Sequence, residues 1–444
     1  MASLSKIKQL GVWMNGHLIG HWTIGIQGRH EFKYTDSWLD SKEARPLSLS
    51  MPLRSSQTSH IGKFVEYYFE NLLPDSDDIR RRIQAKFSSD SSRAFDLLTD
   101  IGKDCVGAIQ LLPPGEEPES LNTITGSPIT PLGIAKALDS SLNTPRLGLH
   151  EDAFRISLAG AQEKTAFLRH KGKWVVPSGT TPTTHIFKLP LGLVGNSQAD
   201  MSTSVENEWL CSRIVKAFQI PVAQCNISTF GERKVLVVKR FDRKLSKDNT
   251  WWMRLPQEDM CQALGYSPLV KYQNQGGPGI LDIMQLLYGS LHSEADRETF
   301  FKTQILFWML AAPDGHAKNF SLFIKNGGKY QLTPLYDIIS AYPIMGKTKQ
   351  KIAPEKIKMA MYVKGKNKHD KWLQIHIDHW FHTAKLCGLS KKRLEVILEE
   401  LIETTPQVIQ KVSAKLPRNF PEFVASSIFT GLKKAAKTLS QQIT

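Results

Sequence analysis

The chain has 444 residues, 41% of them hydrophobic and 22% charged, which suffices for two or three domains with packed cores and excludes a disordered protein. The five cysteines show no C-x-x-C spacing, the first residues lack the apolar core of a signal peptide, and no apolar run reaches about 18 residues. We therefore expect a cytoplasmic protein without a zinc site, a disulfide framework or a membrane span. The net charge of +15 favours a polyanionic partner such as nucleic acid, although a basic surface also serves solubility alone.

The first 146 residues are predicted to form an N-terminal α+β module. Asn15-Gly16 joins two short apolar runs and indicates a hairpin. Apolar residues recur at helical spacing from Phe64 until Pro74, and Asp75 or Ser76 caps the next helix. The remaining predicted elements are a strand over 46–51, a helix over 94–101, a strand over 106–112, and a linker over 113–147 with a short helix near 132–138. The module contains no cluster of His, Cys or acidic residues, so we interpret it as structural or partner-binding.

Residues 147–245 are predicted to form the nucleotide-binding lobe. Residues 154–158 and 164–169 have the composition of two strands, and small residues lie between them at 159–161. Small residues there allow backbone N–H groups to approach phosphates. The segment is neither a Walker A motif nor the three-glycine loop of protein kinases. By itself it is better explained as an ordinary hairpin.

Lys188 lies in an apolar strand, His185 to Pro190, where a lysine is costly to bury without a partner. The pattern resembles the V-A-I-K strand of kinases, whose lysine holds nucleotide phosphates and pairs with a helix glutamate. A helix beginning at Ser204 carries Glu206 and Glu208. We predict that Glu208 is the partner of Lys188; the alternative is that both glutamates face solvent.

The strand Val235 to Val238 leads into a segment that corresponds to a kinase hinge, whose backbone binds adenine. Asp242 follows closely enough for a contact with the ribose hydroxyls. The alternative for this segment is a charged surface loop.

Residues 246–444 are predicted to be mainly helical. Helices are expected over 255–265 after Pro256, from 280 to about 287, and over 300–311. The segment from Lys347 to Lys371 contains nine lysines and only two acidic residues. This excess of positive charge indicates either a solvated surface or a binding surface for a phosphate-rich substrate. His376, His379 and His382 have the spacing of metal ligands on a helix, but we interpret them as ordinary helix positions.

The stretch from Asp314 to Asp337 carries the strongest signal for chemistry. Asp314 and Asn319 have the D-x-x-x-x-N spacing of the kinase catalytic base and metal ligand. Asn326-Gly327-Gly328 between two apolar runs indicates a hairpin, which returns Asp337 to the same place. Two carboxylates and an amide oxygen suit a proton acceptor and a Mg²⁺ site for phosphoryl transfer. The alternative is that Asp314 caps a turn and Asp337 a helix.

Six motifs spread over nearly the whole chain resemble the HipA family of bacterial toxins. They are ENLLPDS from Glu70, FRISLAGAQEKTA from Phe154, PTTHI from Pro182, RLPQEDMCQ from Arg254, DGHAKNF from Asp314 and YDIIS from Tyr336. The resemblance implies an α+β fold: a bilobed, atypical protein-kinase-like structure related to phosphoinositide kinases. An additional N-terminal α+β subdomain (1–146) would precede an N-lobe (147–245) and a helical C-lobe (246–444).

The resemblance also implies roles for individual residues. Asp314 would be the catalytic base, Asn319 and Asp337 would bind Mg²⁺, and Ser157 would be an autophosphorylation site. The ATP-contacting set would consist of Leu158, Ala159, Gly160, Ala161, Lys164, Lys188, Glu208, Lys239, Phe241, Asp242 and His316. Lys239 is a departure, because near relatives carry an acid at this hinge position. Backbone contacts to adenine are expected to survive this change.

The resemblance implies a serine/threonine kinase of a type II toxin–antitoxin system. Its substrate would be an aminoacyl-tRNA synthetase, glutamyl-tRNA synthetase in the nearest relatives, whose phosphorylation stops translation and induces growth arrest and persistence. Its partner would be a HipB-like helix-turn-helix antitoxin, with the toxin as corepressor on operator DNA. Two alternatives from other classes are a catalytically silent DNA-binding corepressor and a small-molecule phosphotransferase of the same fold. The intact Asp314, Asn319, Asp337 and Lys188 argue against silence.

Overall fold

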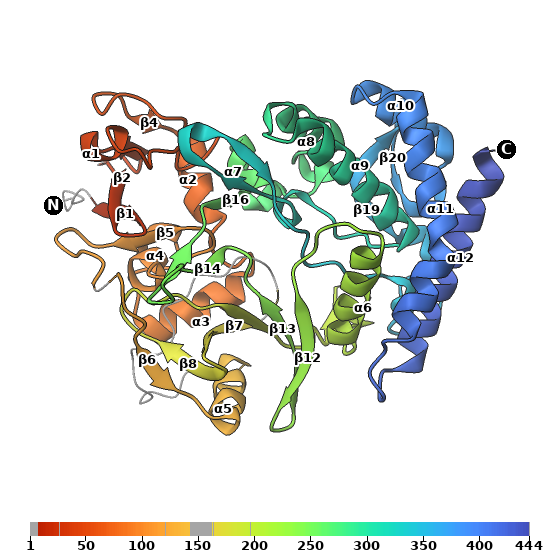
Figure 1. The fold of residues 1–444 in the computed structure, drawn as a ribbon, viewed down its shortest axis with the longest axis horizontal. Coiled ribbons are helices and arrows are strands. Elements are labelled where there is room, and N and C mark those ends of the chain that lie inside the picture. Colours follow the sequence, from red (N-terminus) through yellow and green to blue (C-terminus); the bar gives the residue numbers. More distant parts are fainter. Residues whose placement is uncertain are drawn as a thin grey trace.

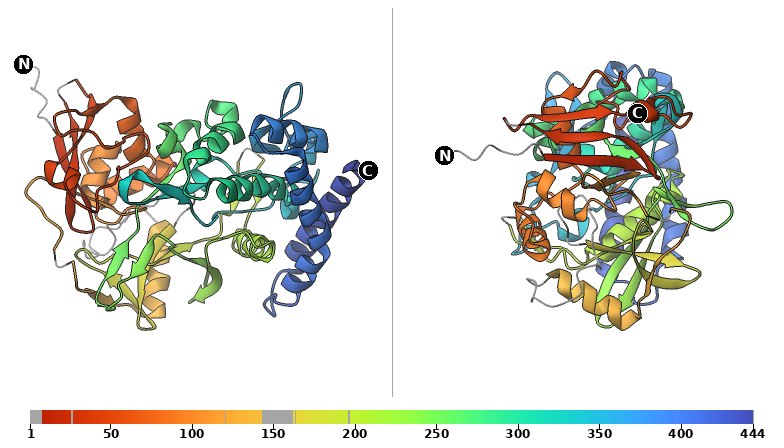
Figure 2. Two further views of the ribbon diagram at one scale, coloured as in Figure 1. Left: turned by 45° about the horizontal axis from the view of Figure 1, so that its top comes forward. Right: turned by 90° about the vertical axis from the view of Figure 1, so that its left-hand side faces the viewer.

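The computed structural model describes residues 8–25, 27–119, 121–142, 162, 164–195 and 197–443. Three regions pack together: an N-terminal module, a six-stranded sheet below it in Figure 1, and a mainly helical region to the right. The two further views show the helices of the C-terminal end stacked at the opposite end of the molecule from the N-terminal sheet (Figure 2). Among the described residues no helix is long and apolar enough to cross a membrane.

The N-terminal module is a five-stranded antiparallel sheet, ordered β4-β3-β2-β1-β5, covered by helices. Its core is aromatic: Trp22 stacks on Phe69 with ring centroids 3.9 Å apart. The hairpin at Asn15-Gly16 and the helix over 94–101 are confirmed. The elements are β1 (Lys8–Met14), β2 (His17–Ile24), β3 (His30–Tyr34), α1 (Asp36–Leu39), β4 (His60–Ile61), α2 (Lys63–Glu70), α3 (Asp77–Phe87), α4 (Ala94–Ile101) and β5 (Ile109–Leu112).

The prediction of a strand over 46–51 is wrong. The segment is a tight turn in which only Ser48 and Met51 bridge. Its backbone groups are satisfied by side chains of other elements: the Leu47 amide donates to the Tyr34 hydroxyl at 2.7 Å and the Leu49 amide donates to Glu258 at 2.8 Å. The apolar alternation reflects burial of Leu47 and Met51 in the module's core and not pairing with another strand.

The middle region is a six-stranded antiparallel sheet in the order β12-β13-β9-β7-β8-β6. Its apolar core contains Phe167, Phe187 and Val235, with Ile134 and Leu138 packed from α5. Consequently β6 and α5, which the predicted boundary at 146 assigns to the first module, pack with this sheet. The elements are β6 (Gly126–Pro128), α5 (Pro131–Leu142), β7 (Lys164–His170), β8 (Lys173–Pro177), β9 (His185–Lys188), β10 (Leu193–Val194), β11 (Ala199–Asp200), α6 (Ser204–Ala217), β12 (Cys225–Phe230) and β13 (Arg233–Lys239).

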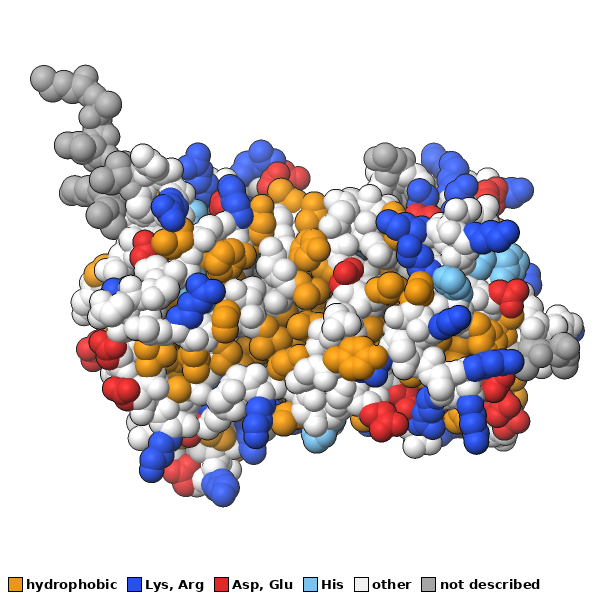
Figure 3. Space-filling view, turned by 90° about the horizontal axis from the view of Figure 1, so that it is seen from above, with side chains coloured by type: hydrophobic (Ala, Val, Ile, Leu, Met, Phe, Trp, Pro, Cys, Tyr) orange, Lys and Arg blue, Asp and Glu red, His pale blue; other side chains and the backbone are white. Residues whose placement is uncertain are grey.

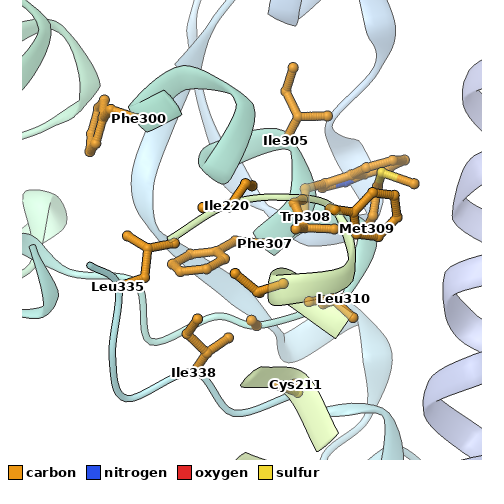
Figure 4. Packing of buried hydrophobic residues seen from close by; sticks show 14 of the residues in the cluster. Cys211, Ile220, Phe300, Ile305, Phe307, Trp308, Met309, Leu310, Leu335 and Ile338 are labelled. Atoms are coloured by element: carbon orange, nitrogen blue, oxygen red, sulfur yellow. The ribbon is translucent and has the colours of Figure 1, made fainter. Parts of the chain in front are cut away.

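The C-terminal region has the largest apolar core, to which α6 also contributes. Figure 4 shows Phe307 of α9 beside Leu335 and Ile338, with Trp308 and Met309 on the opposite side of the same cluster. The elements are β14 (Arg243–Leu245), β15 (Trp252–Arg254), β16 (Gln257–Asp259), α7 (Met260–Leu264), α8 (Ile280–Leu286), α9 (Ser293–Met309), β17 (Ser321–Ile324), β18 (Tyr330–Leu332), β19 (Lys358–Lys364), β20 (Lys368–Lys371), α10 (Ile377–Leu386), α11 (Lys391–Ser413) and α12 (Glu422–Ile443).

The predicted helix over 255–265 is only partly correct. Residues 257–259 form β16, which pairs with β17, and the helix begins at Met260. Asp259 sets that boundary through two reciprocal hydrogen bonds. Its carboxylate accepts from the Gln262 backbone amide at 2.9 Å, and its own backbone amide donates to the Gln262 side-chain oxygen. The N-terminal module docks beside this helix, since Gln262 donates to the Tyr68 carbonyl at 2.9 Å.

The face that looks upward in Figure 1 has an uneven chemical character. Figure 3 shows a band of apolar side chains across its middle, between the N-terminal module on the left and the α10 side on the right. Lys, Arg and His side chains gather on the right-hand part of this face.

Candidate active site

The predicted hairpin after Asn319 is confirmed and organises the site. β17 and β18 pair antiparallel from Leu322↔Leu332 to Ile324↔Tyr330, and Gly327 and Gly328 take φ of 68° and 78° at the turn. The returning chain is fixed by Tyr336, whose hydroxyl donates to the Lys318 carbonyl at 2.8 Å. The hairpin thereby brings the residue after Tyr336 to the segment 314–319.

Asp314, Asn319 and Asp337 all line one pocket between the middle sheet and the C-terminal region, together with Lys188 from β9. Lys164, Lys239, Phe241, Asp242 and His316 line the same pocket. The fold therefore collects these predicted site residues from β7, β9, the end of β13 and the two segments that flank the β17–β18 hairpin.

Lys188 is the centre of the pocket's charge. Its ammonium lies 2.7 Å from Glu208 of α6 and 2.9 Å from Asp337. Burial alone would lower the pKa of Lys188, but the two carboxylates raise it above its ordinary value. Burial opposes ionisation of Asp337 too, yet Lys188 and Lys164 lower its pKa to about 2. Both groups are charged at neutral pH, and Glu206 pairs instead with Lys234.

The backbone at Asp337 is unusual. Its φ is 59°, a left-handed conformation that a residue with a Cβ adopts at a cost of roughly 1–3 kcal/mol. The surrounding bonds of Tyr336 and Lys188 hold it there. Such local strain is characteristic of functional positions, and here it aims the carboxylate at Lys188.

Asp314 occupies the mouth of the pocket, with 55% of its side chain exposed. The Asn319 amide nitrogen donates to the Asp314 carbonyl at 2.7 Å, which fixes the short helical turn over Ala317–Asn319. The Tyr272 hydroxyl donates to a carboxylate oxygen of Asp314. Asp314 is thus ordered through its backbone and its side chain, while one carboxylate edge stays open to the solvent.

The end of the pocket towards the β13 hinge is apolar and suits a flat aromatic ring. Ile186, Val238 and Ile339 line it, and Phe241 stands edge-on to Phe323 with ring centroids 5.8 Å apart. Lys239 is exposed at the rim. An apolar slot next to a group of cations is the arrangement that a nucleoside polyphosphate requires.

A family model described as the HipA-like C-terminal domain matches residues 156–409, and one described as the HipA N-terminal domain matches residues 10–112. The chain belongs to the HipA family. It is 32% identical over 412 residues to "Putative kinase Y4mE" of Sinorhizobium fredii, covering 91% of this chain and 92% of that protein. It is also 29% identical over 319 residues to the serine/threonine-protein kinase toxin HipA of Shewanella oneidensis, covering 69% of each.

The fold agrees with that family. The HipA chain in a complex of Shewanella oneidensis HipA, HipB and operator DNA superposes with a TM-score of 0.79 at 23% identity, covering 98% of both chains. The expected kinase-like α+β fold is therefore confirmed, and this HipA-family chain is a kinase of that fold.

Two observations show that the HipA-family pocket fits a polyphosphate and Mg²⁺. The Nδ1 atom of His316 is buried without a hydrogen-bond partner, which suits a ligand contact. The side-chain nitrogen of Asn319 is engaged, which leaves its oxygen as an acceptor beside Asp337. No cluster of three or more His, Cys, Asp or Glu able to hold a metal occurs among the described residues, including the histidines of α10. Mg²⁺ needs no such cage when substrate phosphates complete its shell.

Lys164 adds a tunable cation next to Lys188. The two lysines are register partners on β7 and β9. Burial and the neighbouring Lys188 lower the pKa of Lys164 to about 8. A bound anion would counteract both causes, so the protonation of Lys164 is coupled to anion binding.

The expected ribose contact of Asp242 is corrected by the structure. Both carboxylate oxygens already accept hydrogen bonds: Oδ1 from Arg240 at 3.0 Å, and Oδ2 from Arg240, Arg243 and the Gly107 amide at 2.8–2.9 Å. The side chain is 4% exposed. Asp242 therefore fastens the hinge to the N-terminal module, and its carboxylate is engaged by protein donors.

The predicted phosphate loop, Leu158 to Ala161, and the predicted autophosphorylation site Ser157 lie outside the described residues. The site residues that were not predicted from the sequence include Asp75, Lys271 and Lys318, which line the pocket, and Tyr272, which donates to Asp314. Only Lys318 could have been noticed, since it stands inside the D-G-H-A-K-N motif.

Proposed function

We propose that this protein is an ATP- and Mg²⁺-dependent serine/threonine-protein kinase that acts as the toxin of a type II toxin–antitoxin pair. The observation that carries the proposal is the ion-pair centre of Lys188, which contacts Glu208 at 2.7 Å and Asp337 at 2.9 Å within the pocket that Asp314 and Asn319 also line. A lysine held between a helix glutamate and a metal-binding aspartate is the arrangement that phosphoryl transfer uses.

Each residue has a role that follows from its position. Asp314, open on one edge, accepts the proton of the attacking hydroxyl. Lys188 and Lys164 face the nucleotide phosphates, and Glu208 keeps Lys188 in place. Asn319 and Asp337 supply oxygen ligands, and Mg²⁺ when bound neutralises the phosphate charge. Phe241 and the hinge backbone after β13 receive the adenine.

The substrate and the partners are proposed from the family. We take the substrate to be an aminoacyl-tRNA synthetase, glutamyl-tRNA synthetase with its tRNA, whose phosphorylation stops translation and causes growth arrest. The partner is a HipB-like helix-turn-helix antitoxin, with which the toxin acts as corepressor on operator DNA; the net charge of +15 suits a complex with nucleic acid. Autophosphorylation on Ser157 would place a phosphate next to those of ATP and weaken ATP binding.

The test is phosphotransfer from labelled ATP with Mg²⁺ to purified glutamyl-tRNA synthetase and to a cell lysate. We expect label on one serine of the synthetase and none with Asp314→Asn, which should still bind ATP. Because a general base contributes about 10²–10⁴-fold to the rate, phosphotransfer by the variant should be at least about 100-fold slower. Label on another synthetase would contradict only the proposed substrate. Label confined to small metabolites would indicate a small-molecule phosphotransferase. No label anywhere from the wild type would indicate a DNA-binding corepressor.

A further inference from the structure

The N-terminal module places one carboxylate inside the pocket. Asp75 lies in the short connection between α2 and α3, and its two oxygens each take a lysine: Oδ1 lies 2.6 Å from Lys318 and Oδ2 lies 2.6 Å from Lys271. All three side chains are mostly buried, with exposures of 12%, 4% and 15% for Asp75, Lys318 and Lys271. A carboxylate and two ammonium groups of the same pocket therefore form a triad across the contact between the module and the C-terminal region.

A structural role in the module itself does not account for Asp75. The start of α3 is capped by Ser76, whose hydroxyl accepts from the Ile79 amide at 3.4 Å. Asp75 makes its two ion pairs with residues 196 and 243 positions away. Lys318 and Lys271 hold the pKa of Asp75 below its ordinary value despite its burial, so the group is ionised throughout the working range.

Both lysines of the triad adjoin the residues that hold the catalytic base. Lys318 precedes Asn319, whose amide nitrogen donates to the Asp314 carbonyl. Lys271 precedes Tyr272, whose hydroxyl donates to the Asp314 carboxylate. The two segments are also joined directly, because the Ala317 amide donates to the Lys271 carbonyl at 3.3 Å. Asp75 thus fixes, through one residue on each side, the backbone contact and the side-chain contact of Asp314.

We propose that Asp75 is a positioning residue for phosphotransfer, so that the N-terminal module completes the active site of the kinase. This inference rests on the proposed function. Asp75 touches neither the nucleotide nor the reacting hydroxyl; it acts through the segments 271–272 and 318–319.

The variant Asp75→Asn keeps the shape of the side chain and removes its charge. We expect kcat to fall about 10- to 100-fold, while KM for ATP changes less than about threefold, because the hinge and Lys188 are untouched. Glu70→Gln is the matched control: Glu70 pairs with Arg80 at 2.7 Å within the same module and does not line the pocket. A kcat that is equal in the two variants and the wild type, or that falls equally in both, would overturn the proposal.

A second variant and a second measurement separate the outcomes. If Asp75→Asn does not fold, Lys271→Gln removes one arm of the triad and should lower kcat without changing KM for ATP; an unchanged kcat there overturns the proposal. Backbone hydrogen exchange is independent of turnover: peptides covering 314–320 should exchange faster in Asp75→Asn and not in Glu70→Gln. If the wild type shows no turnover, only the proposed function is contradicted. If the hydrogen exchange of peptides 314–320 is also the same in Asp75→Asn as in the wild type, the positioning role is contradicted as well.

Discussion

Two groups of buried charges in this molecule differ in how many cationic donors their carboxylates engage. Behind the hinge, Asp104 and Asp242 lie among Arg240, Arg243 and Arg254. Every carboxylate oxygen of this closed cluster accepts at least one hydrogen bond from an arginine, and Thr183 and Gly107 supply further donors. In the pocket, by contrast, the carboxylates of Glu208 and Asp337 share the ammonium group of Lys188.

The difference separates charges that stabilise the fold, in the closed cluster, from charges that are available to a ligand, in the pocket. The closed cluster ties Asp104, Cys105 and Gly107 of the N-terminal module to the chain after β13, so its pairs are structural. In the pocket, the exposed carboxylate edge of Asp314 and the Nδ1 atom of His316 remain available to a ligand. Substitutions in the two clusters should therefore separate stability from activity.

The largest expected effect belongs to the pocket. Asp337→Asn should reduce phosphotransfer about 10³-fold and abolish the Mg²⁺ dependence of ATP binding, because a ligand to the metal is lost. The melting temperature should move little, since Lys188 keeps its bond to Glu208. Calorimetric titration of ATP with and without Mg²⁺, together with thermal unfolding, checks both parts. An unchanged Mg²⁺-ATP affinity would remove Asp337 from the metal site.

The opposite result is expected in the closed cluster. Asp104→Asn leaves three arginines facing one carboxylate and should lower the free energy of unfolding by about 3 kcal/mol, as the loss of one partner of a buried ion pair does. Denaturant titration measures this free energy. The control is Asp139→Asn, which removes one partner of an exposed ion pair with Arg233. A loss below about 0.5 kcal/mol would show that the cluster does not hold the two regions together.

Glu258 sharpens the comparison because it lies at the same contact but has one oxygen without a partner. Burial raises its pKa to about 8. The folded protein then retains a proton that the unfolded chain releases at the ordinary pKa, so stability should fall as pH rises between the two values. Glu258→Gln, permanently neutral, should be close to the wild type at pH 5 and exceed it by about 3 kcal/mol at pH 8. Parallel stability curves for the two proteins over that range would contradict this.

The smallest effect concerns Lys164, whose pKa is lowered to about 8 by burial and Lys188. Above that pH the free pocket loses a positive charge, so ATP affinity should be level below pH 7 and fall roughly tenfold by pH 9. Lys164→Arg should remove the decline, because an arginine stays charged. Titration in two buffers of different ionisation enthalpy should show proton uptake on ATP binding at pH 8.5 in the wild type only. Equal slopes would exclude Lys164 as the titrating group.

The sequence predicted the parts that depend on local signals. The helix over 94–101, the hairpin after Asn319 and the pairing of Lys188 with Glu208 follow from periodicity, turn residues and kinase-like spacing. The strand over 46–51 failed because the partners of its backbone groups are distant side chains. Asp242 failed for a different reason: its neighbours Arg240 and Arg243 supply most of its donors, and the Gly107 amide, 135 residues away, supplies one more.

The triad at Asp75 illustrates the limit of local reasoning. The sequence showed an acidic residue at the start of a helix, for which capping is the ordinary interpretation. Only the docking of the module reveals two lysines on the other side. Residues whose partners lie in another module have no local signature, and the catalytic contribution of a module without catalytic residues of its own cannot be inferred from its composition.

The closed cluster also has a consequence for synthesis on the ribosome. Asp104 bonds to Arg254, which lies 150 residues further along the chain. At the usual 5–20 residues per second, the module waits roughly 8–30 s for the arginine that completes its docking surface. During this interval the β17–β18 hairpin has not been translated. Lys271 and Lys318, the ion-pair partners of Asp75, have not been translated either. A nascent chain therefore lacks a complete pocket until its synthesis has passed Ile339.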